Sequence, residues 1–263
     1  MPGAVVIGAG PGIGRSVALR FAREGMPVAL IARNPKTVQD VAEDVSRLGV
    51  AVACLTADSA DEAALRAALD AAVSQFGLPD VVVYNAAIIR ADAPGELPAS
   101  EQLHTWAVNV VGALTAAAQL APAMARRGNG TFIVTGGMPS PDPRHVSLSL
   151  GKGGVRTLVT LLDQEYGPSG VHVATVTVAG PIAPGTNFDP DDIAEHYWRL
   201  HAQARNEWER ETVYAGLPGD LQAEAAADDL PHDLGGAAEV GSSACRLPPP
   251  PPGAAAPGGA HQA

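Results

Sequence analysis

The chain has few of the residues that mark secreted, membrane-bound or nucleic-acid-binding proteins. It contains two cysteines in 263 residues, Cys54 in an apolar run and Cys245 in a polar segment, so we expect no disulfide framework and a reducing compartment. Its 17 basic residues are outnumbered by 28 acidic ones, and no cluster of lysine and arginine forms a stripe that would neutralise nucleic-acid phosphates. The composition therefore argues against a nucleic-acid partner.

Long hydrophobic runs are also missing. No apolar stretch reaches the roughly 18 residues that a membrane-spanning helix needs, and no charged region precedes the first short apolar run, so we expect no signal peptide. These absences predict a cytoplasmic protein without a membrane partner. The hydrophobic content of 46% is nevertheless ample for the buried core of one domain.

Short apolar runs alternate with longer helical patterns along residues 1–214. The runs expected to be strands are Ala4–Ile7, Val28–Ala32, Ala51–Thr56, Val81–Tyr84, Phe132–Thr135 and Val171–Val178. Near-continuous valine, isoleucine and leucine indicates strands that are buried on both faces, as in a parallel sheet with helical crossovers. We therefore expect a single α/β domain of the Rossmann type, with a doubly wound parallel sheet and a ligand site at the carboxyl ends of its strands.

The last part of the chain departs from this pattern. A helix is expected with Asp189 as N-cap and Pro190 in its first turn. It either packs on the sheet edge or forms a lid over a substrate cleft, with Trp198 and Trp208 supplying apolar surface. Residues 215–263 are rich in alanine, glycine and proline, which predicts a disordered tail and no further strand to complete the sheet.

A glycine-rich loop, Gly8 to Gly14, directly follows the first expected strand and leads into a helix. This arrangement lets backbone N–H groups and the positive end of a helix dipole approach a pyrophosphate. Arg33 follows the second strand, at the position where an acidic residue would bind a free ribose 2′-hydroxyl. An arginine pairs instead with a 2′-phosphate, so the sequence favours NADP, with NAD as the other candidate.

Several separate motifs together resemble the short-chain dehydrogenase/reductase family over about residues 3–185. Its glycine motif is matched by three glycines of the loop, and its Asn-Ala-Gly element appears as Asn85-Ala86-Ala87. Asp58 matches the acid that contacts adenine in this family, and Asn109 matches a helix asparagine that helps to hold a proton-relay water. The cofactor site implied by the resemblance consists of Gly8, Gly12, Ile13, Gly14, Arg33, Asp58, Asn85, Ala86, Lys152 and Ile182.

The catalytic centre departs from the family. Its Tyr-x-x-x-Lys motif pairs a general acid/base tyrosine with a lysine that binds the nicotinamide ribose, but here Leu148 precedes Lys152. Alignment on the fifth strand places Gly137 at the position of the family's serine, whereas counting back from Leu148 lands nearer Thr135. We prefer Gly137, because Thr135 should lie inside the sheet. Only two lysines occur in the chain, so Lys152 is more readily explained by a ribose contact than by solubility, and it is a catalytic candidate with Asn109.

Three residues near Leu148 are candidates for the missing proton donor: His145, Ser147 and Ser149. A histidine is better matched to neutral pH than a hydroxyl, and the alternative is that all three are loop residues without a role. The sequence predicts an NADP-dependent oxidoreductase that transfers a hydride to or from a small carbonyl or alcohol with a nonstandard proton donor. The rival hypotheses are a catalytically inactive NADP-binding protein with a regulatory or structural role, and a scaffold that no longer binds cofactor.

The family usually associates through two long helices, which correspond here to about Asn109–Arg126 and Lys152–Tyr166. We expect a homodimer rather than a tetramer, because the tail offers no strand of the kind that commonly builds the tetramer. No cysteine and histidine spacing suits zinc, and neither a P-loop nor a serine nucleophile elbow is present, so no metal is expected.

Overall fold

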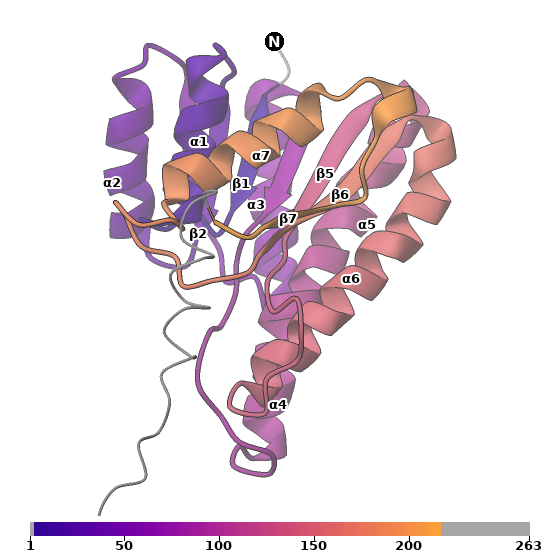
Figure 1. The fold of residues 1–263 in the computed structure, drawn as a ribbon. Coiled ribbons are helices and arrows are strands. Elements are labelled where there is room, and N and C mark those ends of the chain that lie inside the picture. The colour runs from indigo at the N-terminus through magenta and orange to yellow at the C-terminus, as the bar shows by residue number, and fades with distance from the viewer. Residues whose placement is uncertain (1–2, 217–263) are drawn as a thin grey trace, which may run out of the picture. The chain divides into compact units, whose positions relative to one another are not determined.

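Seven parallel strands form one sheet in the order β3-β2-β1-β4-β5-β6-β7. The computed structural model describes residues 3–216, so the expected disordered tail lies outside the described residues except for its first two positions. The strands are β1 (Ala4–Ile7), β2 (Val28–Ala32), β3 (Val52–Thr56), β4 (Val81–Tyr84), β5 (Gly130–Thr135), β6 (Val171–Val178) and β7 (Glu211–Tyr214). The predicted doubly wound α/β fold is confirmed (Figure 1).

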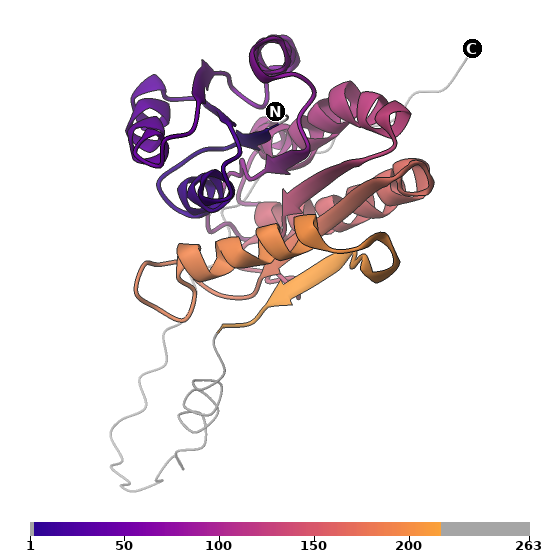
Figure 2. The ribbon, with the colours of Figure 1, turned by 90° about the horizontal axis from the view of Figure 1, so that it is seen from above.

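Helices cover both faces of this sheet (Figures 1 and 2). They are α1 (Ile13–Arg23), α2 (Pro35–Ser46), α3 (Glu62–Phe76), α4 (Ala99–Trp106), α5 (Gly112–Arg127), α6 (Val146–Tyr166) and α7 (Pro190–Ala202), with a π-helical turn η1 (Ala107–Val111) between α4 and α5. One core layer joins the sheet to α1, α2 and α7, and the other joins it to α3, α5 and α6. Successive strand residues alternate between the two layers, since Val5 faces one and Val6 the other.

The seventh strand corrects the expectation that the sheet ends at β6. Thr212 and Tyr214 of β7 are buried and Glu211 and Val213 are exposed, so the strand alternates as an edge strand does. The N–H of Ala179, just after β6, also donates to the carbonyl of Tyr214 at 2.9 Å. The sequence did not predict this strand, because its four residues include only one buried and one exposed apolar side chain and they precede a segment rich in alanine and glycine.

Helix α7 begins as predicted, and its Asp189 side chain accepts the N–H of Asp191. It packs on α1, where the ring of Trp198 meets Phe21 edge-on at 5.8 Å. Trp208 stacks on the ring of His172 at 4.7 Å. Both tryptophans are therefore used in packing, as the first alternative requires, and the lid stays a prediction.

One continuous helical stretch, from Ala99 to Arg127, is long and apolar enough to cross a membrane by length and composition. It spans 29 residues, and its most apolar 18-residue window has a mean hydropathy of 1.4, so the expectation that no such segment exists is wrong. However, 61% of its most apolar window is buried inside the fold, where Ala113, Ala116 and Leu120 pack against the sheet. This is how a core helix of a folded domain behaves.

Candidate functional site

A cleft of about 620 Å³ lies at the carboxyl ends of the central strands. The loops that follow β1, β2, β4, β5 and β6 all contribute to its wall, as expected for the ligand site of a doubly wound sheet. The structure brings most of the residues proposed from the sequence together here. Those lining the cleft are Gly8, Gly12, Ile13, Gly14, Arg33, Asn85, Ala86, Lys152 and Ile182.

The glycine loop is held tightly against the sheet on one side and is open on the other. A Cβ on Gly8, whose φ is +87°, would lie 2.4 Å from the backbone nitrogen of Ala86, and one on Gly14 would lie 2.3 Å from the carbonyl oxygen of Gly8. By contrast, a Cβ on Gly10 or Gly12 would meet nothing within 4 Å. The first pair lets the loop pack closely, and the second leaves room in the cleft.

Helix α1 points its N-terminus into this space. It begins at Ile13, and its N-cap Gly12 supplies no side-chain hydrogen bond. The N–H groups of a first helical turn have no acceptor within the helix. That of Arg15 donates to the carbonyl oxygen of Gly10 at 2.8 Å, so Ile13 and Gly14 offer their N–H groups and the positive end of the dipole to an anion. The donor set and the open glycines fit the diphosphate of a dinucleotide.

The charges around the cleft are of one sign. Arg33 and Lys152 are the only charged side chains among the described residues that line it, although the whole chain has a net charge of -11. Arg33 is exposed, and within residues 3–216 it forms neither an ion pair nor a hydrogen bond through its side chain. A cleft that residues 3–216 line with two cations and no carboxylate, in an acidic protein, favours an anionic ligand.

Lys152 lies on α6 and is buried, with 7% of its surface exposed. Its Nζ donates a hydrogen bond of 2.7 Å to the carbonyl oxygen of Thr135, at the end of β5. Burial, and to a smaller extent the positive charge of Arg156, together lower the pKa of this amine to about 8. Lys152 is therefore held inside the cleft wall and is not a surface charge.

The two departures from the family lie beside this lysine. Leu148 lines the cleft one helical turn before Lys152, and Gly137 lines it from the loop after β5. Thr135 is the last residue of β5, as expected, and its hydroxyl bonds to Asn85 at 2.9 Å and to Tyr197 at 2.7 Å. All four tyrosines of the chain lie in the described part, and none of them lines the cleft.

None of the three candidate proton donors lines the cleft. The hydroxyl of Ser147 donates to Asp92 at 2.8 Å. Ser149 bonds to the backbone of Asp142, and the Nδ1 of His145 lies 3.4 Å from the Asp142 carboxylate. Ser147 and Ser149 belong to α6 and are not loop residues, so the described contacts give them structural roles.

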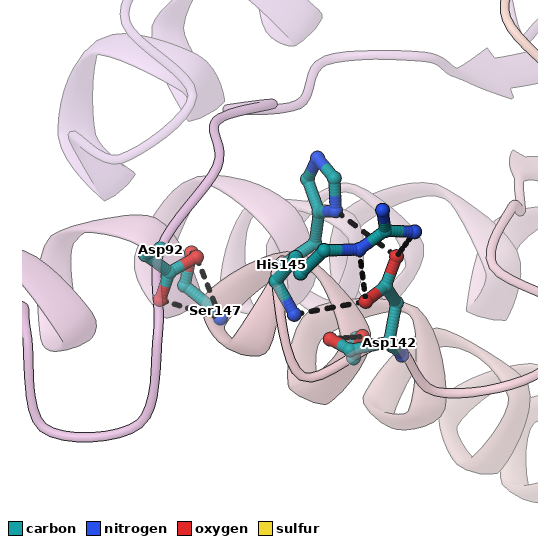
Figure 3. A network of polar contacts seen from close by, with 6 residues as sticks. Asp92, Asp142, His145 and Ser147 are labelled. Atoms are coloured by element: carbon teal, nitrogen blue, oxygen red, sulfur yellow. Dashed lines mark hydrogen bonds and ion pairs between the residues drawn. The ribbon is translucent and has the colours of Figure 1, made fainter. Parts of the chain in front are cut away.

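Asp92 is the residue of this region that the sequence did not reveal. Its carboxylate is buried, with 2% of the residue exposed, and it accepts both the N–H and the hydroxyl of Ser147 (Figure 3). It therefore caps the N-terminus of α6 from the loop that follows β4. The two residues are 55 positions apart, and no local pattern reports such a contact.

Arg156, one turn after Lys152, was also missed. Its Nη2 donates to the carbonyl oxygens of Gly137 and Met138 at 2.9 and 2.7 Å, and its Nε lies 3.3 Å from the Glu211 carboxylate of β7. Met138 has a φ of 48°, which is unfavourable for a residue with a side chain. Arg156 thus fixes a strained loop that lines the cleft.

Asp58 and Asn109 do not line the cleft. The Asp58 carboxylate accepts the N–H of Ala60 at 2.9 Å, although its neighbours Ala57 and Ser59 do line the cleft. Asn109 lies in η1 with 2% of its surface exposed, and its side-chain amide pairs with both backbone groups of Ile88. In the described structure Asn109 holds the segment after β4, and a contact with a relay water stays a prediction.

The fold and the cleft define a doubly wound α/β protein whose glycine loop and helix N-terminus would suit an anionic ligand. The family model of the short chain dehydrogenases matches residues 3–189. The chain therefore belongs to the short-chain dehydrogenase/reductase family, a family of oxidoreductases, as the sequence motifs predicted.

Individual relatives agree with this assignment. Glucose 1-dehydrogenase 2 of Bacillus subtilis (strain 168) is 29% identical over 191 residues, covering 71% of this chain and 74% of that protein. The 3-oxoacyl-(acyl-carrier-protein) reductase FabG of Staphylococcus aureus (strain Mu50) is 30% identical over 197 residues, covering 73% and 79%. An alcohol dehydrogenase from the archaeon Thermococcus sibiricus, solved with 5-hydroxy-NADP, superposes with a TM-score of 0.74 at 25% identity, covering 81% of this chain and 95% of that one.

Proposed function

We propose that this chain binds NADP(H) in the cleft and transfers a hydride to or from a small carbonyl or alcohol. The observation that carries the proposal is the meeting of an open glycine loop, a helix N-terminus and two cations at the carboxyl ends of the strands, with no carboxylate from residues 3–216 lining the cleft. Its relatives are named as dehydrogenases and reductases, and a similar structure contains an NADP derivative. We place this activity in residues 1–214 and, from the low cysteine content, in the cytoplasm.

Each part of the cofactor has a candidate partner in this chain. The first-turn N–H groups of α1 would hold the diphosphate, and Arg33 the 2′-phosphate. Lys152 would hold the nicotinamide ribose, and Ile182 would pack near the nicotinamide. Asp58, at the end of β3, remains the candidate for the adenine. When bound, the nicotinamide supplies or accepts the hydride.

The choice of NADP over NAD depends on Arg33. Replacing Arg33 by alanine should raise the Kd for NADPH about tenfold or more, because a charge-assisted pair with the 2′-phosphate is lost, and should change the Kd for NADH little. Fluorescence titration with each cofactor measures both constants. Lys36→Ala is the matched control, since Lys36 lies nearby on α2, is exposed, pairs with Asp40 and does not line the cleft. A wild-type chain that binds NADH as tightly as NADPH would contradict the preference.

A second candidate is cofactor binding without turnover, favoured by Leu148 and Gly137 in the positions where the family has its tyrosine and serine. The two functions separate in one assay, in which NADPH oxidation is followed over a panel of aldehydes and ketones. The cleft wall near Lys152 is largely apolar, with Ile89, Met138 and Leu148 among its residues. If NADPH is oxidised, hydrophobic carbonyl compounds should therefore react faster than sugars.

We further propose that two copies associate through α4, α5 and α6. Large apolar side chains are exposed on these helices and on η1 at Leu103, Trp106, Val111, Leu114, Leu150 and Leu161. Light scattering should give the mass of a dimer, and Leu114→Glu with Leu161→Glu should give that of a monomer because it places charges in the interface. Leu48→Glu, at an exposed site between α2 and β3, is the control. A monomeric wild-type chain would refute the dimer.

A further inference from the structure

We propose that Lys152 itself is the proton donor to the substrate oxygen, in place of the tyrosine that this chain lacks. The inference rests on the proposed hydride transfer, and it gives Lys152 a second role beside holding the ribose. Four observations on the cleft carry it: which ionisable groups line the cleft, what covers the lysine, what the ammonium contacts, and which charges surround it.

The first observation is an elimination. Of the described side chains that line the cleft, only Arg33 and Lys152 can carry a proton as a charged acid. A guanidinium does not give up its proton in proteins, and Arg33 follows β2, which is separated from β5 and Lys152 by β1 and β4. His145, Ser147 and Ser149 are bound to Asp142 and Asp92 outside the cleft.

The second observation is access. Gly137 has no side chain, and a Cβ at this position would lie 3.5 Å from Cε and 3.9 Å from Cδ of Lys152. A serine in this place would therefore pack its side chain against the end of the lysine stem. Leu148 brings no polar atom to the same wall. The two substitutions that remove the usual catalytic groups thus also leave the end of Lys152 next to the substrate space.

The third observation concerns the hydrogen bonds of the ammonium. Nζ carries three hydrogens when protonated, and it donates one bond, to the carbonyl oxygen of Thr135. No carboxylate of residues 3–216 forms an ion pair with it. One donor is therefore used as an anchor at the end of β5, and the others remain for a ligand.

The fourth observation is the balance of charges around Lys152. On α6, Arg156 repels the ammonium and adds to the effect of burial, and these two causes bring the pKa to about 8. Glu211 of β7 is paired with Arg156 and not with the lysine. From α7, Tyr197 reaches only the Thr135 hydroxyl, and burial raises the pKa of its own hydroxyl. The amine is thus mostly protonated at pH 7 and still gives up its proton readily, as an acid catalyst must.

The proton step balances with the residues present. As the hydride reaches the carbonyl carbon, the C=O π bond breaks and its electron pair moves to oxygen. An N–H bond of Lys152 breaks, an O–H bond forms, and the electrons of the N–H bond stay on nitrogen. The products are an alcohol and a neutral amine, and the amine regains its proton from solvent. In the oxidative direction the neutral amine accepts the proton from the alcohol.

The proton affinity of Lys152 can be measured without turnover. Because the chain has only two lysines, protein labelled with ¹³C at lysine Cε gives two resonances, which Lys36→Arg assigns. We expect the Lys152 signal to titrate near pH 8. Lys36 is the internal standard, since the exposed Lys36 pairs with Asp40, which raises its pKa above the usual value. A Lys152 midpoint above pH 10 would overturn the proposal.

The kinetic test uses the same pH range. With saturating NADPH and a hydrophobic aldehyde, kcat/KM should fall above the pH at which Lys152 titrates. Lys152→Arg keeps the charge and the donors but cannot release a proton, so reduction should slow about 100-fold or more while the Kd for NADPH changes only a few-fold. Lys36→Arg should leave both quantities unchanged.

The outcomes separate this proposal from the function on which it rests. If the wild-type chain does not bind NADPH, both fail. If NADPH binds but no carbonyl compound is reduced, hydride transfer and the assignment of Lys152 both fail and only the cofactor site stands. If the wild-type chain reduces the aldehyde and Lys152→Arg reduces it at the same rate, the assignment of Lys152 alone is overturned.

Discussion

Replacing Leu148 by tyrosine and Gly137 by serine in one variant is expected to raise the rate of NADPH-dependent carbonyl reduction about 100-fold, within the range usual for a positioned general acid. Leu148 and Gly137 already line the cleft beside Lys152. The new hydroxyls would therefore enter an existing site, one turn from a buried ammonium that lowers the pKa of a tyrosine. Steady-state assays of the single and double variants with one aldehyde measure the gain.

The backbone conformation is less favourable for the serine at position 137 than for the tyrosine at position 148. Gly137 has a φ of +153°, a conformation that residues with a side chain rarely adopt, so serine there should cost about 1–3 kcal/mol of stability. Relative to the stability that is lost, Leu148→Tyr alone is therefore expected to give the largest increase in the rate of carbonyl reduction. Leu150→Tyr is the matched control, because Leu150 lies on the same helix but is exposed and outside the cleft.

The same variant tests the role of Lys152 by a different readout. Once a tyrosine donates the proton, the fall of kcat/KM near pH 8 should move, because the group that titrates is no longer the amine alone. No increase in turnover, with NADPH still bound, would mean that the missing groups do not limit the reaction. A faster variant with an unchanged pH profile would mean that the added tyrosine does not carry the proton.

The parts of the fold that the sequence predicted are those with a local physical signal. Strands such as Val81–Tyr84 are buried on both faces, so their apolar runs stand out from the helices around them. The cap at Asp189 likewise depends on neighbours within three residues. β7 escaped because an edge strand of four residues buries little, and its pairing with β6 depends on residues more than 30 positions away.

The candidate site divides in the same way. Gly8 and Gly14 were found because close packing of the loop forbids a side chain at each position. Lys152 was found because it occupies the position of the lysine in the family's Tyr-x-x-x-Lys motif. Arg156 was not found, because its role depends on the unusual backbone of Met138 and on Glu211 of an unexpected strand. Contacts between loops that meet only in the folded chain leave no periodic pattern in the sequence.

The Asp92 contact shows how much such a hidden link contributes. Asp92→Ala should lower the free energy of unfolding by about 3 kcal/mol, because two buried donors of Ser147 lose an ionised acceptor and the first turn of α6 loses its cap. The Asp92 oxygens lie 2.9 and 3.1 Å from the Ser147 nitrogen and 2.8 Å from its hydroxyl. Urea unfolding followed by circular dichroism measures the change.

Asp142→Ala is the matched control, since it removes a second carboxylate of the network in Figure 3 whose partners Arg144 and His145 are more exposed. It should cost less than about 1 kcal/mol, as exposed ion pairs do. Asp92 also joins the loop that contains Ile89 to the first turn of α6, which contains Leu148. Its loss should therefore raise the KM for a carbonyl substrate more than the Kd for NADPH, because the glycine loop proposed to bind NADPH follows β1. Equal losses of stability in the two variants would contradict the stabilising role of the buried cap, and an unchanged KM in Asp92→Ala would contradict its role in joining these two walls of the cleft.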